Sequence, residues 1–200
     1  MKYFLNLVLL VSFLSCAQNK QQLTGDTAWQ REMNTKFKDA SESPLTEKGL
    51  KKFKGLDFFT FDSTYVVTAQ LTRTPNAKPF KMKTTTERLP DYKQYGVITF
   101  TLKGKEHKLS IYQNLGLLTR EGYEDYLFLP FLDDTNGEGS YAGGRYTEAR
   151  IPEGNTIVID FNTAYNPYCA YNKKYSCPIV PRANYLETRI EAGVKAYRKN

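Results

Sequence analysis

The sequence predicts a mainly β protein, with an antiparallel sheet folded as a sandwich or open barrel and one or two N-terminal helices. Three observations support this fold class. The 200 residues include 15 Tyr and 12 Phe but only one Trp and three Met, and aromatic residues favour strands. Apolar and polar side chains alternate with a period of two after Gly55, and a tight hairpin is indicated around Gly104.

The first 15 residues, MKYFLNLVLLVSFLS, have the pattern of a signal peptide, with one Lys followed by an apolar run. That run covers about half of the roughly 20 residues that a transmembrane helix needs. Small Ser15 precedes Cys16, and the stretch FLSC resembles a bacterial lipobox, in which the Cys thiol carries a lipid such as palmitate. The alternative is an ordinary secretory signal followed by an incidental Cys.

We therefore expect three parts in the chain: a signal peptide over 1–15, a lipidated Cys16 with a flexible tether over 16–27, and a single β-rich domain over 28–200. The tether is polar and has no apolar period. This organisation predicts a lipoprotein of the bacterial cell envelope. It would be anchored to the membrane through Cys16 and face the periplasm or the outer surface.

The chain is moderately basic, with a net charge of +7. Nucleic acid is not an expected partner, because the basic residues form no strip with interleaved aromatic residues. This charge is compatible with binding to anionic lipid, a glycan or a small anionic ligand. The alternative is a basic surface that contacts only solvent. The small basic clusters are Lys51, Lys52 and Lys54; Lys81 and Lys83; and Lys173 and Lys174.

Cys169 and Cys177 remain as a pair once Cys16 is set aside, and a disulfide is the expected state of such a pair in an exported protein. Closing this short loop would stabilise the fold by roughly 2.5 kcal/mol. The ligand types and their spacing do not favour zinc, and we expect no metal and no cofactor. A nucleophilic Cys with His107 as its base is an alternative.

Two helices are expected before Gly55. Residues 26–40 place Trp29, Met33 and Phe37 on one helical stripe behind an Asp cap. A short second helix is expected to begin with Pro44 in its first turn.

Strands are expected after Gly55. In the first of them, Tyr65, Val67, Ala69 and Leu71 should share one face. The segments GVITFTL and HKLSIYQN should form a hairpin across KGKE. His107 lies in phase with the apolar residues of that hairpin, which favours a structural imidazole.

The segment DYLFLPFLD predicts a strand that is edge-like or bulged at Pro130. The acidic stretch DDTNGEGS after it is compatible with a calcium loop, but its spacing and its Asn-Gly pair favour a turn. TIVIDFN predicts a further, buried strand. It leads directly into a segment rich in Tyr, Asn and Pro that contains both cysteines.

The motifs YAGGRY and IDFNTAYNPYCAYNKKYSCP, together with the upstream SPLT and FKGLDFF, resemble the bacterial and archaeal family known as domain of unknown function 1684. The resemblance spans about residues 29–195. It departs at Thr147 and Glu148, where relatives tend to show Leu-Asp, at PRANYL, where PPENRL is usual, and at Val194, which replaces an acid. It implies a shared fold unit and a shared site but no activity.

The polar residues of these motifs could line the mouth of a pocket in the sheet and bind a small or glycan-like ligand. The candidate ligand-binding residues are Arg145, Tyr146, Asp160, Asn162, Tyr165 and Asn166. The alternative is structural: Arg145 and Asp160 would form a salt bridge, and the two Asn would satisfy loop backbone.

Two other functions remain open. One is a hydrolase or transferase that uses Asp160 with His107 or Tyr165 as proton carriers, which requires these side chains to meet within hydrogen-bond reach. The other is an interaction module of the cell envelope without a small-molecule ligand.

Overall fold

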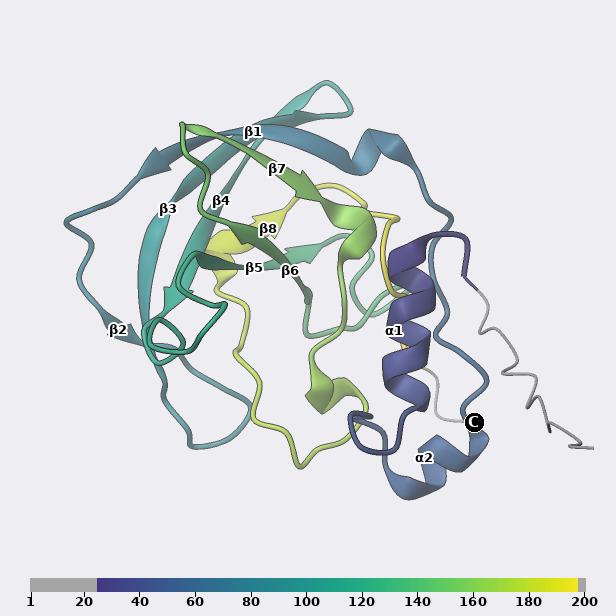
Figure 1. Ribbon diagram of the computed structural model, residues 1–200. Helices are drawn as coiled ribbons and strands as arrows, with labels where there is room; N and C mark the ends of the chain where they lie inside the picture. The colour runs from purple at the N-terminus through teal and green to yellow at the C-terminus, as the bar shows by residue number, and fades with distance from the viewer. Residues whose placement is uncertain (1–24, 198–200) are drawn as a thin grey trace, which may run out of the picture.

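Two N-terminal helices and a curled antiparallel sheet are the main elements of the computed structural model, which describes residues 25–197 (Figure 1). The helices are α1 (Ala28–Lys38) and α2 (Glu47–Lys52), both before the sheet. The predicted fold class is therefore confirmed.

Each helix begins at a threonine cap. Thr27 accepts a hydrogen bond from the backbone N–H of Gln30, whose side chain in turn accepts one from the Thr27 backbone N–H, so α1 begins with a capping box. At α2 the Thr46 hydroxyl accepts from the backbone N–H of Gly49. The prediction of Pro44 in the first turn of this helix was wrong, because the cap at Thr46 places the start of α2 after the proline.

The sheet has the strand order β6-β5-β4-β3-β1-β7, with β2 beside β3 and β8 beside β5. Every pairing is antiparallel except the parallel one between β5 and β8. The strands are β1 (Val66–Arg73), β2 (Phe80–Lys81), β3 (Asp91–Leu102), β4 (Lys105–Asn114), β5 (Tyr126–Asp133), β6 (Arg145–Arg150), β7 (Thr156–Asp160) and β8 (Tyr185–Leu186).

Strand β1 and the β3–β4 hairpin follow the predicted pattern. The residues expected on one face of the first strand are buried, and those between them in β1 are exposed. The hairpin turns at Lys103 and Gly104, both with positive φ (51° and 78°), as a two-residue turn between twisted strands requires. His107 is buried on the hairpin, and its ring stacks on Phe100 with 5.7 Å between centroids.

The ladder between β4 and β5 is interrupted near Pro130, where a bulge or edge was expected. These strands pair only at Tyr112 and Phe128. Next to this pair the buried Asn184 side chain forms hydrogen bonds with backbone groups of both strands, in place of direct bonds between the strands. Its amide donates to the carbonyl oxygens of Pro130 (2.7 Å) and Ser110 (2.8 Å), and its oxygen accepts from the Ser110 N–H (2.9 Å).

The sheet curls into a half-barrel, so that its two edge strands, β6 and β7, approach each other (Figure 1). Tyr146 of β6 and Tyr165, which follows β7, exchange two backbone hydrogen bonds of 2.9 and 2.8 Å. We call this pair the seam. Apolar side chains fill the space inside the curl, among them Ile98, Ile111, Leu127, Leu129 and Ile159.

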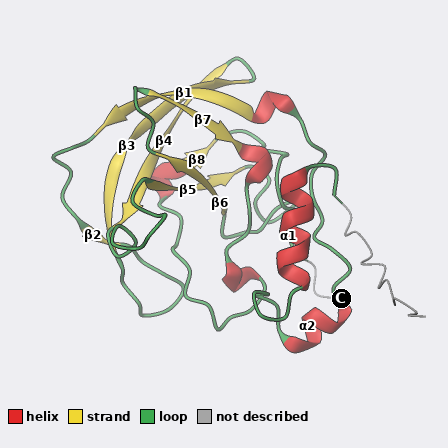
Figure 2. Cartoon of the chain, in the orientation of Figure 1, coloured by secondary structure: helices red, strands yellow, loops and turns green. Residues whose placement is uncertain are grey.

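The helices pack beyond the seam, on one side of the sheet (Figure 2). Phe37 of α1 contacts Phe53 and Tyr171 in a separate apolar cluster that also includes Val194 near the C-terminal end. Among the helices of residues 25–197, none combines the length and apolar character that a membrane span requires.

Candidate functional site

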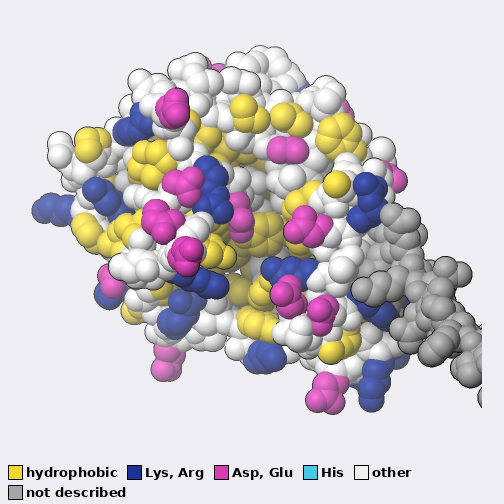
Figure 3. All heavy atoms as spheres, viewed as in Figure 1, with side chains coloured by type: hydrophobic (Ala, Val, Ile, Leu, Met, Phe, Trp, Pro, Cys, Tyr) yellow, Lys and Arg dark blue, Asp and Glu magenta, His cyan; other side chains and the backbone are white. Residues whose placement is uncertain are grey.

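A cavity of about 590 Å³ lies between α1 and the seam. Figure 3 shows it as a hollow with hydrophobic side chains on its floor and charged side chains around its mouth. We call it the tyrosine cavity, because seven of its lining residues are tyrosines: Tyr92, Tyr123, Tyr126, Tyr146, Tyr165, Tyr168 and Tyr175.

Strands β5 and β6 supply one wall. Tyr126 and Phe128 lie two residues apart on β5, and Tyr146 and Glu148 lie two residues apart on β6. Alternate residues of a strand point to the same face, so both pairs face the cavity. The Phe128 and Tyr146 rings meet edge to face, with 4.7 Å between centroids.

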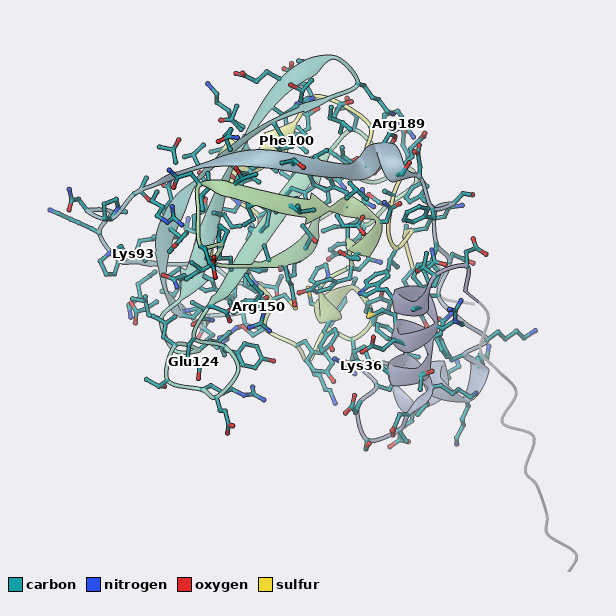
Figure 4. The ribbon with its side chains drawn as sticks, turned by 45° about the horizontal axis from the view of Figure 1, so that its top comes forward. Lys36, Lys93, Phe100, Glu124, Arg150 and Arg189 are labelled. Carbon is teal, nitrogen blue, oxygen red and sulfur yellow. The ribbon has the colours of Figure 1, made fainter. Side chains whose placement is uncertain are left out.

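Helix α1 supplies the opposite wall. Trp29, Met33 and Lys36 line the cavity, and their spacing of four and three residues places them on one side of the helix. Figure 4 shows Lys36 on the side of α1 that faces the sheet, across from Arg150.

The segment from Tyr165 to Pro178 supplies the third wall. The Tyr168 and Tyr175 rings pack edge to face at 5.3 Å. The segment is held from outside by Thr85, whose N–H donates to the Cys177 carbonyl (2.9 Å) and whose hydroxyl accepts from the Cys177 N–H (3.1 Å).

Glu148 is the carboxylate of the sheet wall. The Tyr165 hydroxyl donates to Glu148 Oε1 at 2.5 Å. Burial raises the pKa of Tyr165 well above its ordinary value, and the neighbouring Tyr126 and Glu148 act in the same direction. Burial and the Glu148 charge raise the pKa of Tyr126 likewise. Both phenols therefore stay protonated and act as donors at neutral pH.

Tyr146 and Tyr165 are the two sequence-predicted site residues that line the cavity. Arg145 does not. Its guanidinium is fully buried behind the seam, where it pairs with Asp133 at 3.1 Å and donates to the carbonyl oxygens of Ile190 (2.7 Å) and Ala192. Burial lowers the pKa of Arg145, and the Asp133 charge opposes that shift.

Asp160, Asn162 and Asn166 hold loop backbone. The Asp160 carboxylate accepts from the Asn162 backbone N–H at 2.8 Å. The Asn162 side chain bonds both the N–H and the carbonyl of Asp62 (3.1 and 2.9 Å), and Asn166 donates to the Lys195 carbonyl (2.9 Å). The structural alternative is thus right about both Asn, but the partner of Arg145 is Asp133 and not Asp160.

Cys169 and Cys177 lie side by side as free thiols, with the Cys169 N–H 3.2 Å from Cys177 Sγ. The hydrogen bond from the Cys177 thiol lowers the pKa of Cys169 to about 6; burial opposes this, and bonds from Thr85 and Tyr141 support it. The disulfide stays a prediction. Cys16, the expected lipidation site, lies outside the described residues.

The acid–base pairs expected from the sequence are not formed among the contacts of residues 25–197. His107 stacks on Phe100 in the β3–β4 hairpin, and the Tyr165 hydroxyl bonds Glu148 instead of Asp160. Within the same range, no group of three or more His, Cys, Asp or Glu side chains is arranged to hold a metal ion.

Sequence reasoning missed Glu148 and the helix wall. Glu148 stands two residues after Tyr146, so the two-residue period could have placed both on one face. The sequence places Trp29, Met33 and Phe37 on one helical stripe but does not distinguish core positions from cavity-lining ones. Only Phe37 is fully buried, whereas Trp29 and Met33 are half-buried and line the cavity with Lys36.

Comparison with known proteins supports the resemblance noted in the sequence. Residues 51–195 match the family model described as "Protein of unknown function (DUF1684)". A similar solved structure is the solution NMR structure of an uncharacterised protein of Haloarcula marismortui, which is 32% identical with a TM-score of 0.65. The match covers 83% of this chain and 89% of that one. No curated protein matches the chain.

Proposed function

The chain belongs to the DUF1684 family, and we propose that it is an exported lipoprotein of the bacterial cell envelope whose tyrosine cavity binds a small or glycan-like ligand. The cavity volume of about 590 Å³ lies within the range of roughly 300–1,000 Å³ that is usual for small-molecule sites.

The observation that carries this proposal is the combination of aromatic rings and a bonded carboxylate in one hollow. Tyr168, Tyr175 and Trp29 are half-buried and line the cavity, where the apolar face of a sugar or another ring can pack against them. Glu148, fixed by Tyr165, offers a further carboxylate oxygen to a ligand hydroxyl or amide N–H. Such a mixture of ring surface and fixed polar groups favours a neutral polar ligand.

The proposed binding residues are therefore Tyr146 and Tyr165, as expected from the sequence, together with Glu148, Tyr168 and Trp29. The other four sequence candidates support the walls: Arg145 behind the seam, Asp160 at the end of β7, and Asn162 and Asn166 in the segment that follows it.

The chain's single Trp lines the cavity, so its fluorescence can report binding. We expect titration with the trisaccharide of N-acetylglucosamine to change the Trp29 emission. Glu148→Gln and Tyr168→Ala should each weaken the affinity about tenfold, the loss of one well-placed hydrogen bond or ring contact. Tyr185→Ala is the matched control, because Tyr185 is exposed on β8 and does not line the cavity.

Native mass spectrometry of the protein expressed with export should in addition detect a co-purified small molecule. Trisaccharide binding that the Glu148 and Tyr168 variants leave unchanged would place the ligand elsewhere and contradict the proposal.

The lipoprotein part of the proposal is supported by the sequence of residues 1–16 alone. Mass spectrometry of the membrane fraction should find an N-terminal Cys16 that carries acyl chains, which would provide firm anchoring at about 0.8 kcal/mol per buried methylene. An intact chain that still begins at Met1 would contradict export.

A further inference from the structure

A second cavity, of about 490 Å³, lies between α2 and the C-terminal end of the described chain. The Tyr197 hydroxyl reaches Gly49 of α2, and the Lys195 N–H donates to the Asp57 carbonyl at 2.8 Å. These contacts join α2, the segment after it and residues 194–197 into one hollow, which we call the lysine cavity.

The floor of the lysine cavity is apolar and fixed. Phe53, Leu56, Tyr171 and Val194 line it, and all four are buried in the cluster around Phe37. The Tyr171 and Tyr197 rings pack with 4.9 Å between centroids. The cavity is therefore supported by packed side chains, and its shape does not depend on the exposed lysines.

The lining is strongly basic. Four lysines and one acidic residue, Asp57, line the cavity, which gives the lining a formal charge of +3; the lysines are Lys48, Lys52, Lys54 and Lys195. The Lys195 ammonium also lies over the Phe59 ring, 5.2 Å from its centroid. Within residues 25–197 none of the ion pairs includes Lys48, Lys54 or Lys195. The four come from α2, from the turn after it and from the C-terminal segment, so residues far apart in the sequence converge on one hollow.

We infer that the lysine cavity binds a phosphate-bearing anion, at a site separate from the tyrosine cavity. Lysine is a compact point charge and a common phosphate ligand in proteins. A lining with a formal charge of +3 suits a multiply charged group better than a single carboxylate. The phosphate could belong to a lipid headgroup or to a free phosphate compound, because the recognising chemistry is the same.

The test is calorimetric titration of the purified full chain, at low salt, with two probes. Inorganic pyrophosphate represents the free compound, and dihexanoyl phosphatidylglycerol, kept below its micelle concentration, represents the headgroup. We expect at least one probe to bind. The double variant Lys54→Gln/Lys195→Gln should weaken that binding at least about tenfold, as the loss of two charge-assisted contacts implies.

Two further variants separate the cavity from the general basicity of the chain. Lys51→Gln removes an exposed charge from α2 that does not line the cavity, so the affinity should change less than about twofold. Asp57→Asn removes the one lining carboxylate and should tighten binding. The probe that binds more tightly identifies the source of the phosphate.

The inference is overturned if neither probe binds, or if Lys51→Gln weakens binding as much as the double variant does. The second result would show that binding depends on the general positive charge of the surface and not on the lysine cavity. All the residues changed are exposed, so none of these variants should prevent folding.

Discussion

Arg145 is a sequence-predicted binding residue whose contacts lie inside the fold and not in the tyrosine cavity. Its guanidinium is completely buried beside the Phe59 and Phe131 rings, at 5.7 and 5.3 Å from their centroids. Asp133 supplies the countercharge, and its carboxylate also accepts from the Ile190 N–H at 2.8 Å. A buried cation is tolerated when a countercharge and hydrogen bonds compensate it. Here the two terminal nitrogens of Arg145 are hydrogen-bonded, whereas its buried Nε has no hydrogen-bond partner within residues 25–197.

Asp133→Ala should therefore destabilise the protein strongly. It leaves the Arg145 charge buried without a partner, which costs about 3–5 kcal/mol in comparable pairs. Urea unfolding measures the loss of free energy. Asp125→Ala breaks the exposed ion pair with Arg150 and should cost no more than about 1 kcal/mol. Equal losses in the two variants would show that Asp133 does not compensate a buried charge.

The thiol pair offers a second prediction for single residues. In the reduced protein, iodoacetamide should modify Cys169 with a midpoint near pH 6, because its pKa is lowered to about 6 and the thiolate is the reactive form. Cys177, whose pKa is raised by the hydrogen bond to Cys169, should react far more slowly. Peptide mass spectrometry distinguishes the two sites.

In the exported protein neither thiol should be modified until it has been reduced, since we expect a disulfide there. Modification of both cysteines before reduction would contradict the disulfide. A midpoint of Cys169 modification near pH 8.5 would contradict the lowered pKa.

At the level of elements, the weakest pairing of the sheet is that between β4 and β5, where Asn184 replaces the missing ladder. Asn184→Ala should cost about 1–3 kcal/mol, because it leaves the buried polar groups of Ser110 and Pro130 without partners. Thermal unfolding measures the loss. Asn76→Ala, at an exposed turn position, should stay within about 0.5 kcal/mol of the native protein, and a similar shift in both variants would contradict the role of Asn184.

Individual elements of the sheet could be predicted from the sequence because their signals are local. The alternation in β1 and the Lys103–Gly104 turn depend on neighbouring residues, and the structure confirms both. The start of α2 could not be placed, because Pro44 and Thr46 both suit a helix N-terminus and the hydrogen bond at Thr46 decides between them.

The candidate site was less predictable because it depends on contacts between distant segments. Tyr146 and Tyr165 meet only because the sheet curls until its edges join. No local pattern distinguishes Asp133, which pairs with Arg145, from Asp160, which holds a loop. Of the adjacent residues Arg145 and Tyr146 in GGRY, only Tyr146 lines the cavity, and the sequence does not distinguish the buried position from the cavity-lining one.

At the level of the whole molecule, acid should destabilise the fold through His107. Burial lowers its pKa below the ordinary value of about 6.5, and the charge of Lys105 adds to the effect. The unfolded chain therefore takes up this proton at higher pH than the folded chain does. The contribution to stability is present above about pH 6.5 and is lost as the pH falls through the lowered pKa.

The free energy of unfolding, measured in urea between pH 7 and pH 5, should decrease with acid in the native protein and decrease less steeply in His107→Gln. Parallel curves for the two proteins would assign the pH dependence to other groups.

The seam gives the tyrosine cavity a mechanical role. The backbone hydrogen bonds between Tyr146 and Tyr165 join the two edges of the curled sheet, and both residues line the cavity. A ligand bound in this cavity would contact both the curled sheet and helix α1. Separating the sheet edges at Tyr146 and Tyr165 would therefore require the ligand to dissociate. Occupancy should thus slow hydrogen exchange at these two amides before it affects the far side of the sheet.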